Sequence, residues 1–506
     1  MPNPVPVIAP PDEHNARLLA NVHPPAWRNP TPRDRYHLVV IGAGTAGLVT
    51  AAGAAGLGAR VALVERYLMG GDCLNVGCVP SKAVISAARE WHAARTVGST
   101  FGGPRAEGEG DFGTVMKRMR KLRADLSATD SVHRFAELGV DVFLGEGRFT
   151  GPESVTVDGS VLRFRRAVIA TGARAAVPSI PGIEDAGYYT NETIFSLTER
   201  PERLLVLGAG PIGCELAQAF ARLGSAVTVV TRGDRILSRD DPDAARLVAA
   251  SLRADGVMLE FGARVHRVER VTGGTRVHLA RGGDTVVVEG DALLVATGRT
   301  PNIADLGLEV AGVAVGKHAV AVDDRLRTTN RRVYAIGDVA SRYQFTHAAD
   351  FQARLVLANA LFFGRSRASR LVIPWSTYTS PEVAQVGLTE AEAHREGVAI
   401  ETITIPFADV DRAVLAGATD GFLRVHVRRG TDTLVGVTVV APDAGDLIAE
   451  AALAMTNGLG LSAMGRTIHP YPTMAEAYRK AADRWRRSKL TPVARRILGV
   501  WFRLFT

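Results

Sequence analysis

Two segments of the chain repeat one glycine-punctuated pattern, and this repeat limits the fold more than any other feature. The first runs from Tyr36 through a strand-like apolar run, three glycines and a small-residue helix to a second strand ending at Glu65. The second runs from Leu204 to Thr231 in the same order. A strand, a Gly-x-Gly-x-x-Gly turn and a helix are typical of a βαβ unit that holds a dinucleotide pyrophosphate at the helix N-terminus.

Each glycine of the repeat has its own physical task. The first permits a tight turn, the second lets the backbone approach the pyrophosphate, and the third lets the helix pack on the strand. Two such units predict two dinucleotide sites. The triplets are Gly42, Gly44 and Gly47 in the first unit, and Gly208, Gly210 and Gly213 in the second.

The rest of the chain predicts more strands that end in glycine turns, followed by a domain of a different type. A length of 506 residues suggests about three domains. Apolar strands that end in glycine turns recur at 167–173, 293–302 and 333–339. After Gly364 the pattern changes to short alternating strands and a helical stretch, which is typical of an antiparallel sheet with helices. The strands span 421–428 and 433–440, and the helical stretch runs from Asp443 to Thr456.

The net charge of +8 belongs to the C-terminal end of the chain. Nine Lys or Arg and one acid, Asp483, lie between Arg479 and Thr506, so residues 1–478 sum to zero. The charge therefore does not indicate nucleic-acid binding. Beyond Pro492 the tail would gather apolar residues on one face if helical, which fits peripheral contact with an anionic membrane or packing against a dimer. These residues are Val493, Ile497, Leu498, Trp501, Leu504 and Phe505.

The N-terminal 35 residues show no periodic core signal and are expected to form an extension. Seven prolines lie in the first 25 positions, and no pattern typical of a signal peptide is present. No run of about 18 apolar residues occurs anywhere in the chain. We therefore expect a cytoplasmic protein.

The pair Cys73 and Cys78 is the strongest chemical signal. A regular helix would advance about 7.5 Å over five residues, whereas a disulfide needs Cα atoms about 4.4–6.8 Å apart. Leu74 to Gly77 must then coil irregularly, before a helix that we expect near Pro80. A thiol at a helix start has a lowered pKa, which suits a redox dithiol. Inert buried cysteines or a metal site are alternatives, although no second Cys or His pair nearby suggests zinc. The third cysteine, Cys214, is expected in a helix core.

These motifs carry a family resemblance. The string GGDCLNVGCVPSK, the two glycine units, the ATG turns and the Gly337–Asp338 pair resemble the class I pyridine nucleotide-disulfide oxidoreductases over residues 36 to about 480. Within that family the segments ELAQAFARLG (215–224) and PYPTMAEA (470–477) are similar to mercuric reductase-like flavoproteins. The fold class implied is α/β, with two Rossmann-like domains for FAD and NAD(P)H and a C-terminal α+β dimerisation domain.

The resemblance implies a division of the chain and a homodimer. The predicted segments are an extension (1–35), the FAD-binding domain in two parts (36–187 and 291–364), the NAD(P)H-binding domain (188–290), the dimerisation domain (365–480) and a basic amphipathic tail (481–506).

The resemblance also assigns cofactor residues. Glu65 can hold ribose hydroxyls of FAD, and Asp338 resembles the acid on the flavin side chain. In the second unit Thr231 stands at the position equivalent to Glu65, so the acid is missing there, and Arg232 follows. This favours NADPH because an arginine can bind a 2′-phosphate; the alternative is a solvated loop arginine. Further positions expected along the cofactors are Gly147, Thr171, Gly172 and Gly298.

The implied electron path ends at the cysteines. Hydride passes from nicotinamide to flavin, which opens a Cys73–Cys78 disulfide; Cys78 is the thiolate at the ring, and Cys73 exchanges with an external disulfide or binds a soft metal ion transiently. An ion pair between Lys82 and Glu215 is implied beside the flavin, the alternative being two surface charges.

A third pair of residues bears on the substrate. In disulfide reductases of the family that this chain resembles, a histidine and a glutamate five residues later, both from the partner subunit, serve as acid and base. The resemblance aligns Glu476 with that glutamate, which puts Tyr471 at the position of the histidine, and His469 lies two positions earlier. A tyrosine is a poor proton acceptor at neutral pH. This favours a soft metal ion such as Hg(II), although the tail lacks the cysteine pair of mercuric reductases and no N-terminal metal-binding module is present. A small-disulfide reductase and a membrane-associated electron-transfer flavoprotein remain as alternatives.

Overall fold

The computed structural model describes residues 6–104, 108, 110–282 and 284–505. They group into two compact units, one within 1–234 and 256–371 and the other within 235–255 and 372–506. Positions 1–5 of the predicted extension and Thr506 of the predicted tail lie outside the described residues.

The first sheet of the first unit is built on the first glycine repeat. Strands β1 (Tyr36–Ile41) and β2 (Val61–Glu65) pair in parallel and are almost wholly buried, which explains their mostly apolar sequence. Strand β1 also pairs in parallel with β6, which is fully buried only over its last three residues, 167–169. The strand order is β3 (Val140–Leu144), β2 (Val61–Glu65), β1 (Tyr36–Ile41), β6 (Ser160–Ile169), β5 (Ser154–Val157) and β4 (Arg148–Gly151), and β16 (Val333–Ala335) also pairs with β6.

A second parallel sheet is built on the second repeat. Its β14 continues to Val295, so this sheet extends past the boundary predicted at residue 290. The order is β10 (Met258–Glu260), β9 (Ala226–Val230), β8 (Arg203–Leu207) and β14 (Ala292–Val295). The antiparallel strands β11 (Arg264–Val271), β12 (Gly274–Arg281) and β13 (Asp284–Gly290) form a small sheet, and β7 (Ala173–Ala175) pairs with β15 (Arg299–Pro301).

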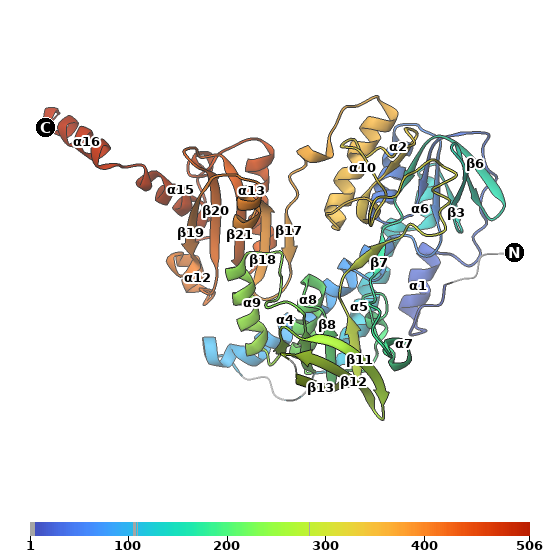
Figure 1. Ribbon diagram of the computed structural model, residues 1–506, viewed down its shortest axis with the longest axis horizontal. Helices are drawn as coiled ribbons and strands as arrows, with labels where there is room; N and C mark the ends of the chain where they lie inside the picture. The colour runs from blue at the N-terminus through green and yellow to red at the C-terminus, as the bar shows by residue number, and fades with distance from the viewer. Residues whose placement is uncertain (1–5, 105–107, 109, 283, 506) are drawn as a thin grey trace. The chain divides into compact units, whose positions relative to one another are not determined.

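The helices of this unit link the two sheets. Helix α4 (Cys78–Phe101) packs against both α5 (Phe112–Leu126) and α8 (Pro211–Arg222). Helices α2 (Thr45–Gly56) and α10 (Thr346–Leu361) lie side by side (Figure 1). The start of α4 therefore lies where residues from both glycine repeats can reach it.

Both glycine turns need glycine for the same steric reasons. Gly42 has φ +101, and a Cβ there would lie 2.4 Å from the carbonyl oxygen of Ala170. A Cβ at Gly47 would lie 1.8 Å from the oxygen of Gly42. Gly208 and Gly213 repeat both contacts, at 2.4 and 2.1 Å. The two repeats in the sequence are thus two equivalent turns in the structure.

The N-terminal extension packs against the first sheet, although its sequence shows no periodic core signal. Helix α1 (Glu13–Val22) buries Leu18 and Val22 in the hydrophobic core of the first sheet. Asp12 caps it by accepting the Asn15 N–H at 2.8 Å. Ten helical residues beside many prolines are too short for a periodicity signal in the sequence.

The second unit contains the predicted antiparallel sheet. The two alternating strands expected from the sequence are present as β20 (Phe422–Arg428) and β21 (Leu434–Ala441), and the helical stretch is present as α13 (Ala444–Thr456). The strand order is β17 (Trp375–Thr377), β18 (Glu382–Gly387), β21 (Leu434–Ala441), β20 (Phe422–Arg428) and β19 (Ile400–Pro406).

Helix α9 (Pro242–Ala254) belongs to this second unit, although the sequence analysis placed it in the domain 188–290. Arg424 of β20 holds it through Asp241 at 2.6 Å and Asp243 at 2.7 Å. Long-range charge pairs of this kind leave no mark in local sequence.

The packing of α1 can be tested by one truncation. Leu18→Ala should lower the free energy of unfolding by about 2–5 kcal/mol, because it leaves a cavity in a core position that is 1% exposed. The matched change Leu57→Ala, at a position 59% exposed, should cost less than about 0.5 kcal/mol. Denaturant unfolding measures both. Equal effects of the two substitutions would show that α1 does not pack as described.

Candidate active site

The two cysteines lie at the junction of two helices. Cys73 is in α3 (Gly71–Asn75), and Cys78 is the first residue of α4, with Gly77 as the N-cap. Both are free thiols, Cys73 half-buried and Cys78 exposed. At the first helical position Cys78 faces unpaired backbone N–H groups and the positive end of the α4 dipole.

The break between the helices is shorter than the sequence suggested. We expected an irregular stretch from Leu74 to Gly77 and a helix near Pro80, but Leu74 is helical and α4 begins at Cys78. The chain turns only at Val76 and Gly77. A Cβ at Gly77 would lie 2.8 Å from the Asp72 carbonyl oxygen, so the turn requires glycine.

Contacts around the pair give the two thiols opposite acidities. A hydrogen bond from the Cys73 thiol, supported by Thr346 and by the charge of Lys82, lowers the pKa of Cys78 to about 6. The same bond raises the pKa of Cys73. Thr346 Oγ1 lies 3.4 Å from Cys78 Sγ. Near pH 7 the site therefore holds one thiolate, on Cys78, and one thiol, on Cys73.

Lys82 and Glu215 meet across the two helices that carry them. Lys82 lies one turn after Cys78 on α4, and its Nζ is 2.8 Å from Glu215 Oε2 on α8. The Glu215 side chain is buried, whereas that of Lys82 is about one third exposed. The ion pair that the resemblance implied is thus present, rather than two separate surface charges.

Charged residues missed by the sequence analysis surround Asp338. Arg299 Nε lies 3.3 Å from Asp338 Oδ2, and the same guanidinium is ion-paired with Asp72, the neighbour of Cys73. Burial raises the pKa of Asp338, and the charge of Arg299 opposes this shift. The position of Arg299, directly after the second ATG turn, was the available signal in the sequence.

A second missed residue, Arg123, braces the dithiol loop. It donates from Nη1 to the Asn75 carbonyl at 2.7 Å and from Nη2 to Asn15 Oδ1 at 2.6 Å. Asn75 lies between the two cysteines, and Asn15 is in α1. The N-terminal extension therefore supports the redox loop through a buried arginine, a link that no sequence motif announces.

The residues expected around FAD form a continuous set of turns in the first unit. Glu65 is buried and accepts the N–H groups of Ala43 and Tyr67, each at 2.7 Å, and burial raises its pKa. Thr171 is held by Asn302, to whose carbonyl its Oγ1 donates at 2.7 Å.

The glycines of the set differ in their surroundings. Gly172 and Gly298 have positive φ and open space where a Cβ would stand, which leaves room for a ligand. A Cβ at Gly147 would instead lie 3.0 Å from Val64 and 3.3 Å from Ile41, so strand packing already explains that glycine. Gly44 caps α2 without a side-chain bond, so the first amides of that helix can bind phosphate. The residues present fit a bound FAD.

The second nucleotide turn has the same open helix start. Gly210 caps α8 without a side-chain bond, and a Cβ there would meet nothing within 4 Å. Arg232 is exposed and makes no ion pair with another described residue. It is therefore available for a phosphate.

Tyr471 and Glu476 are not paired with each other within the chain. The Tyr471 hydroxyl donates to Asp411 Oδ2 at 2.9 Å, and this bond raises its pKa. Glu476 is buried and binds Arg479. His469 Nε2 lies 2.9 Å from Glu450 Oε1. Among the described residues no group of three or more His, Cys, Asp or Glu could hold a metal ion.

Comparison with known proteins agrees with this architecture. Residues 36–353 match the pyridine nucleotide-disulphide oxidoreductase family and residues 373–482 its dimerisation domain. The chain therefore belongs to the pyridine nucleotide-disulphide oxidoreductases, and it is an FAD-containing oxidoreductase. The predicted family and fold class are confirmed, and the dimerisation domain supports a homodimer.

Individual relatives differ in substrate. Mercuric reductase of Lysinibacillus sphaericus is 36% identical over 450 residues, 89% of this chain and 82% of the relative. Dihydrolipoyl dehydrogenase of Thermus scotoductus is 37% identical over 462 residues, 88% of this chain and 97% of the relative. The HOCl-induced flavoprotein disulfide reductase RclA of Escherichia coli has a TM-score of 0.79 and 32% identity, covering 88% of this chain and 99% of RclA.

The acidity of Cys78 can be measured in the reduced protein. Alkylation by iodoacetamide at Cys78, located by mass spectrometry, should rise with pH through a midpoint near 6, because only the thiolate reacts. Lys82→Met should move the midpoint up, toward the free value of about 8.5, because it removes a cation that favours the thiolate. Lys82→Arg keeps the charge and should change it little. A midpoint near 8.5 in the unmodified protein would contradict the described contacts.

Proposed function

We propose that this enzyme passes electrons from NADPH to a soft metal ion, of which Hg(II) is the best candidate. The observation that carries the proposal is the hydrogen bond from the Tyr471 hydroxyl to the Asp411 carboxylate, which raises the pKa of Tyr471. A group of this kind cannot exchange protons efficiently near pH 7, as reduction of an external disulfide requires. Binding and reducing a soft cation requires thiolates and no such base. The similarity to mercuric reductases supports the same choice.

The residues of the chain would divide the work. FAD, when bound, supplies two-electron transfer between a nicotinamide and a disulfide. Glu65, Asp338 and the turns at Gly42 and Thr171 would hold it. Lys82 would stabilise negative charge near Cys78, and the less acidic Cys73 would be the exchanging thiol. In balance, NADPH gives up a hydride to become NADP+, Hg(II) takes its two electrons to become Hg(0), and the remaining proton is released to water.

Reduction of a small disulfide is the second candidate function. His469, next to the Tyr471 segment, pairs with Glu450 and so has the carboxylate partner that an acid–base histidine needs. RclA, a structural relative, is named a disulfide reductase, and another of its structures is named a Cu(II) complex.

We also propose that the sites are shared across the homodimer, with Tyr471 of one subunit at Cys73 of the other.

Turnover with different acceptors separates these functions. NADPH oxidation by the holoenzyme should be stimulated by Hg(II) in excess thiol, and much less by glutathione disulfide, lipoamide or quinones. Cys73→Ser and Cys78→Ser should each lower the Hg(II)-dependent rate by at least about 100-fold, because the dithiol is lost. Cys214→Ser, a buried cysteine in α8, should leave it nearly unchanged. Preferred turnover of a disulfide would favour the second candidate.

The NADPH preference is tested at Arg232. Arg232→Glu should lower kcat/KM for NADPH by about 10–100-fold and improve it for NADH, because it replaces a phosphate partner with an acid that repels phosphate. Arg264→Glu, an exposed arginine of the same unit, should change neither value. Equal efficiencies with NADPH and NADH in the unmodified enzyme would leave Arg232 without this role.

A further inference from the structure

The chain ends in a helix that its own unit leaves uncovered. Helix α15 (Glu476–Ser488) is fixed to the second unit by buried Ala477, Tyr478, Ala481 and Ala482. Helix α16 (Pro492–Leu504) follows after three residues and has no buried residue. Figure 1 shows it at the end of α15, standing clear of the sheet of the same unit.

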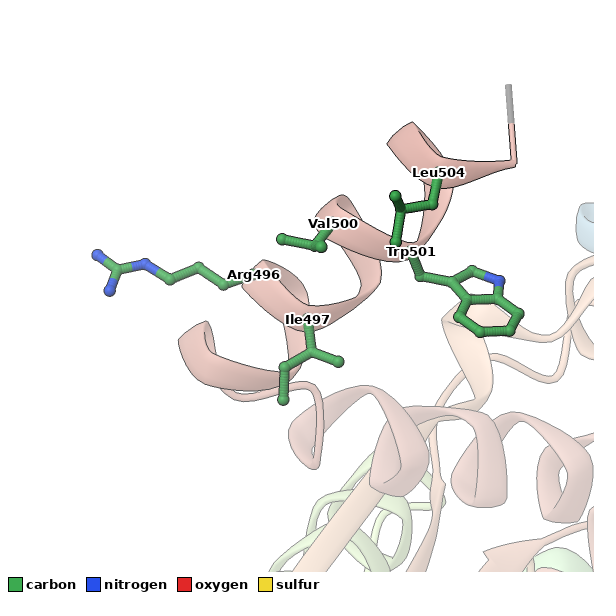
Figure 2. Close-up of a pocket in the computed structure, with 5 residues that line it drawn as sticks. All are labelled: Arg496, Ile497, Val500, Trp501 and Leu504. Carbon is green, nitrogen blue, oxygen red and sulfur yellow. The ribbon is translucent and has the colours of Figure 1, made fainter.

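The exposed side chains of α16 are mostly apolar and share one face. Their exposed fractions run from 41% at Leu498 to 74% at Leu504. Val493, Ile497, Val500, Trp501 and Leu504 follow helical spacing along the middle of this face. Figure 2 shows four of these side chains around a shallow hollow, with the guanidinium of Arg496 extending outward. So broad an uncovered apolar face is unusual on a protein surface.

The opposite edge of α16 is basic. By helical spacing Arg495, Arg496 and Arg503 share it with Gly499. Within the described part of the tail none of the three arginines makes an ion pair, and no acid follows Asp483. The helix therefore offers cations and apolar side chains together.

Apart from the exposed Arg487, the basic residues of 479–489 are already engaged with groups of the same unit, so fewer cations are available there than the sequence suggested. Lys489 Nζ lies 2.7 Å from Glu401 Oε2, and Arg484 binds the Thr404 carbonyl. Arg486 donates to the Ser462 carbonyl at 3.1 Å. The cations free to meet a partner are thus concentrated on α16 rather than spread from residue 479 onward.

We propose that α16 lies on an anionic lipid surface and attaches the enzyme to it peripherally. Free arginines beside Trp, Phe, Ile and Leu on one short helix are the pattern of an interfacial helix. The arginines match the charge of anionic headgroups, and the apolar face enters the acyl boundary. No described helix is long and apolar enough to cross a membrane, so the contact is at the surface.

Charge and shape argue against other occupants. Nucleic acid would leave the apolar face in water. A second α16 seated on the first would bring the basic edges of the two helices together. The inference concerns a surface outside the redox site and does not depend on which acceptor the enzyme uses.

Vesicle flotation of the full-length holoenzyme tests the proposal with matched variants. The unmodified protein should float with phosphatidylglycerol vesicles and hardly at all with phosphatidylcholine vesicles, and salt should weaken the binding. Arg495→Ala/Arg496→Ala should weaken it by about 25-fold, about fivefold for each arginine. Ile497→Ser/Trp501→Ser should weaken it by at least about tenfold, because the apolar contact is lost. Gly499→Ser introduces the same side chain on the basic edge and should bind as the unmodified protein does.

Three outcomes would overturn the proposal. The first is no flotation of the unmodified protein with either lipid. The second is equal flotation of the Ile497→Ser/Trp501→Ser and Gly499→Ser proteins, since the contact would then be charge alone. The third is a change in oligomeric state by light scattering in the Ile497→Ser/Trp501→Ser protein without any vesicle binding, which would make α16 an interface between copies. Unchanged NADPH-dependent activity in detergent-free solution would confirm that the variants are folded.

Discussion

The hydrogen bond between Cys73 and Cys78 is the interaction on which the chemistry depends. It places negative charge on Cys78 and keeps the proton on Cys73, so one dithiol has two distinct members before any substrate arrives. The surrounding structure serves this asymmetry. The start of α4 supplies unpaired amides, Lys82 supplies a cation one turn further on, and Gly77 allows the bend that brings the sulfurs together.

Much of the fold could be predicted because its constraints are local. The glycine turns at Gly42 and Gly208 are each encoded by a short run of neighbouring residues, and in both sheets a side chain at that glycine would clash with a carbonyl oxygen. The alternating strands of the second unit are equally local. The features that the sequence did not predict depend on tertiary contacts. Leu18 and Val22 of α1 enter a core that no neighbouring residue reveals, and α9 joins the second unit through charges on a distant strand.

The site shows the same division. Cys78 and Lys82 could be placed from a short string and a helix start. Arg123 could not, because its partners lie 48 and 108 positions away in sequence and its burial follows only from packing. For Tyr471 the sequence supplied the residue type, and the structure adds the bond to Asp411 that raises its pKa. That bond makes the phenol a weaker acid, so less of the phenolate that could accept a proton is present near pH 7, and this directs the proposal toward a metal acceptor.

The most direct measurement is the long-wavelength absorbance of the two-electron-reduced holoenzyme across pH, since such a band requires a thiolate against oxidised flavin. The account predicts a band at pH 7 that disappears with a midpoint near 6 as Cys78 is protonated. It also predicts no band in Cys78→Ser, and a band without reduction in Cys73→Ser. A band that persists in Cys78→Ser would contradict the assignment of the thiolate.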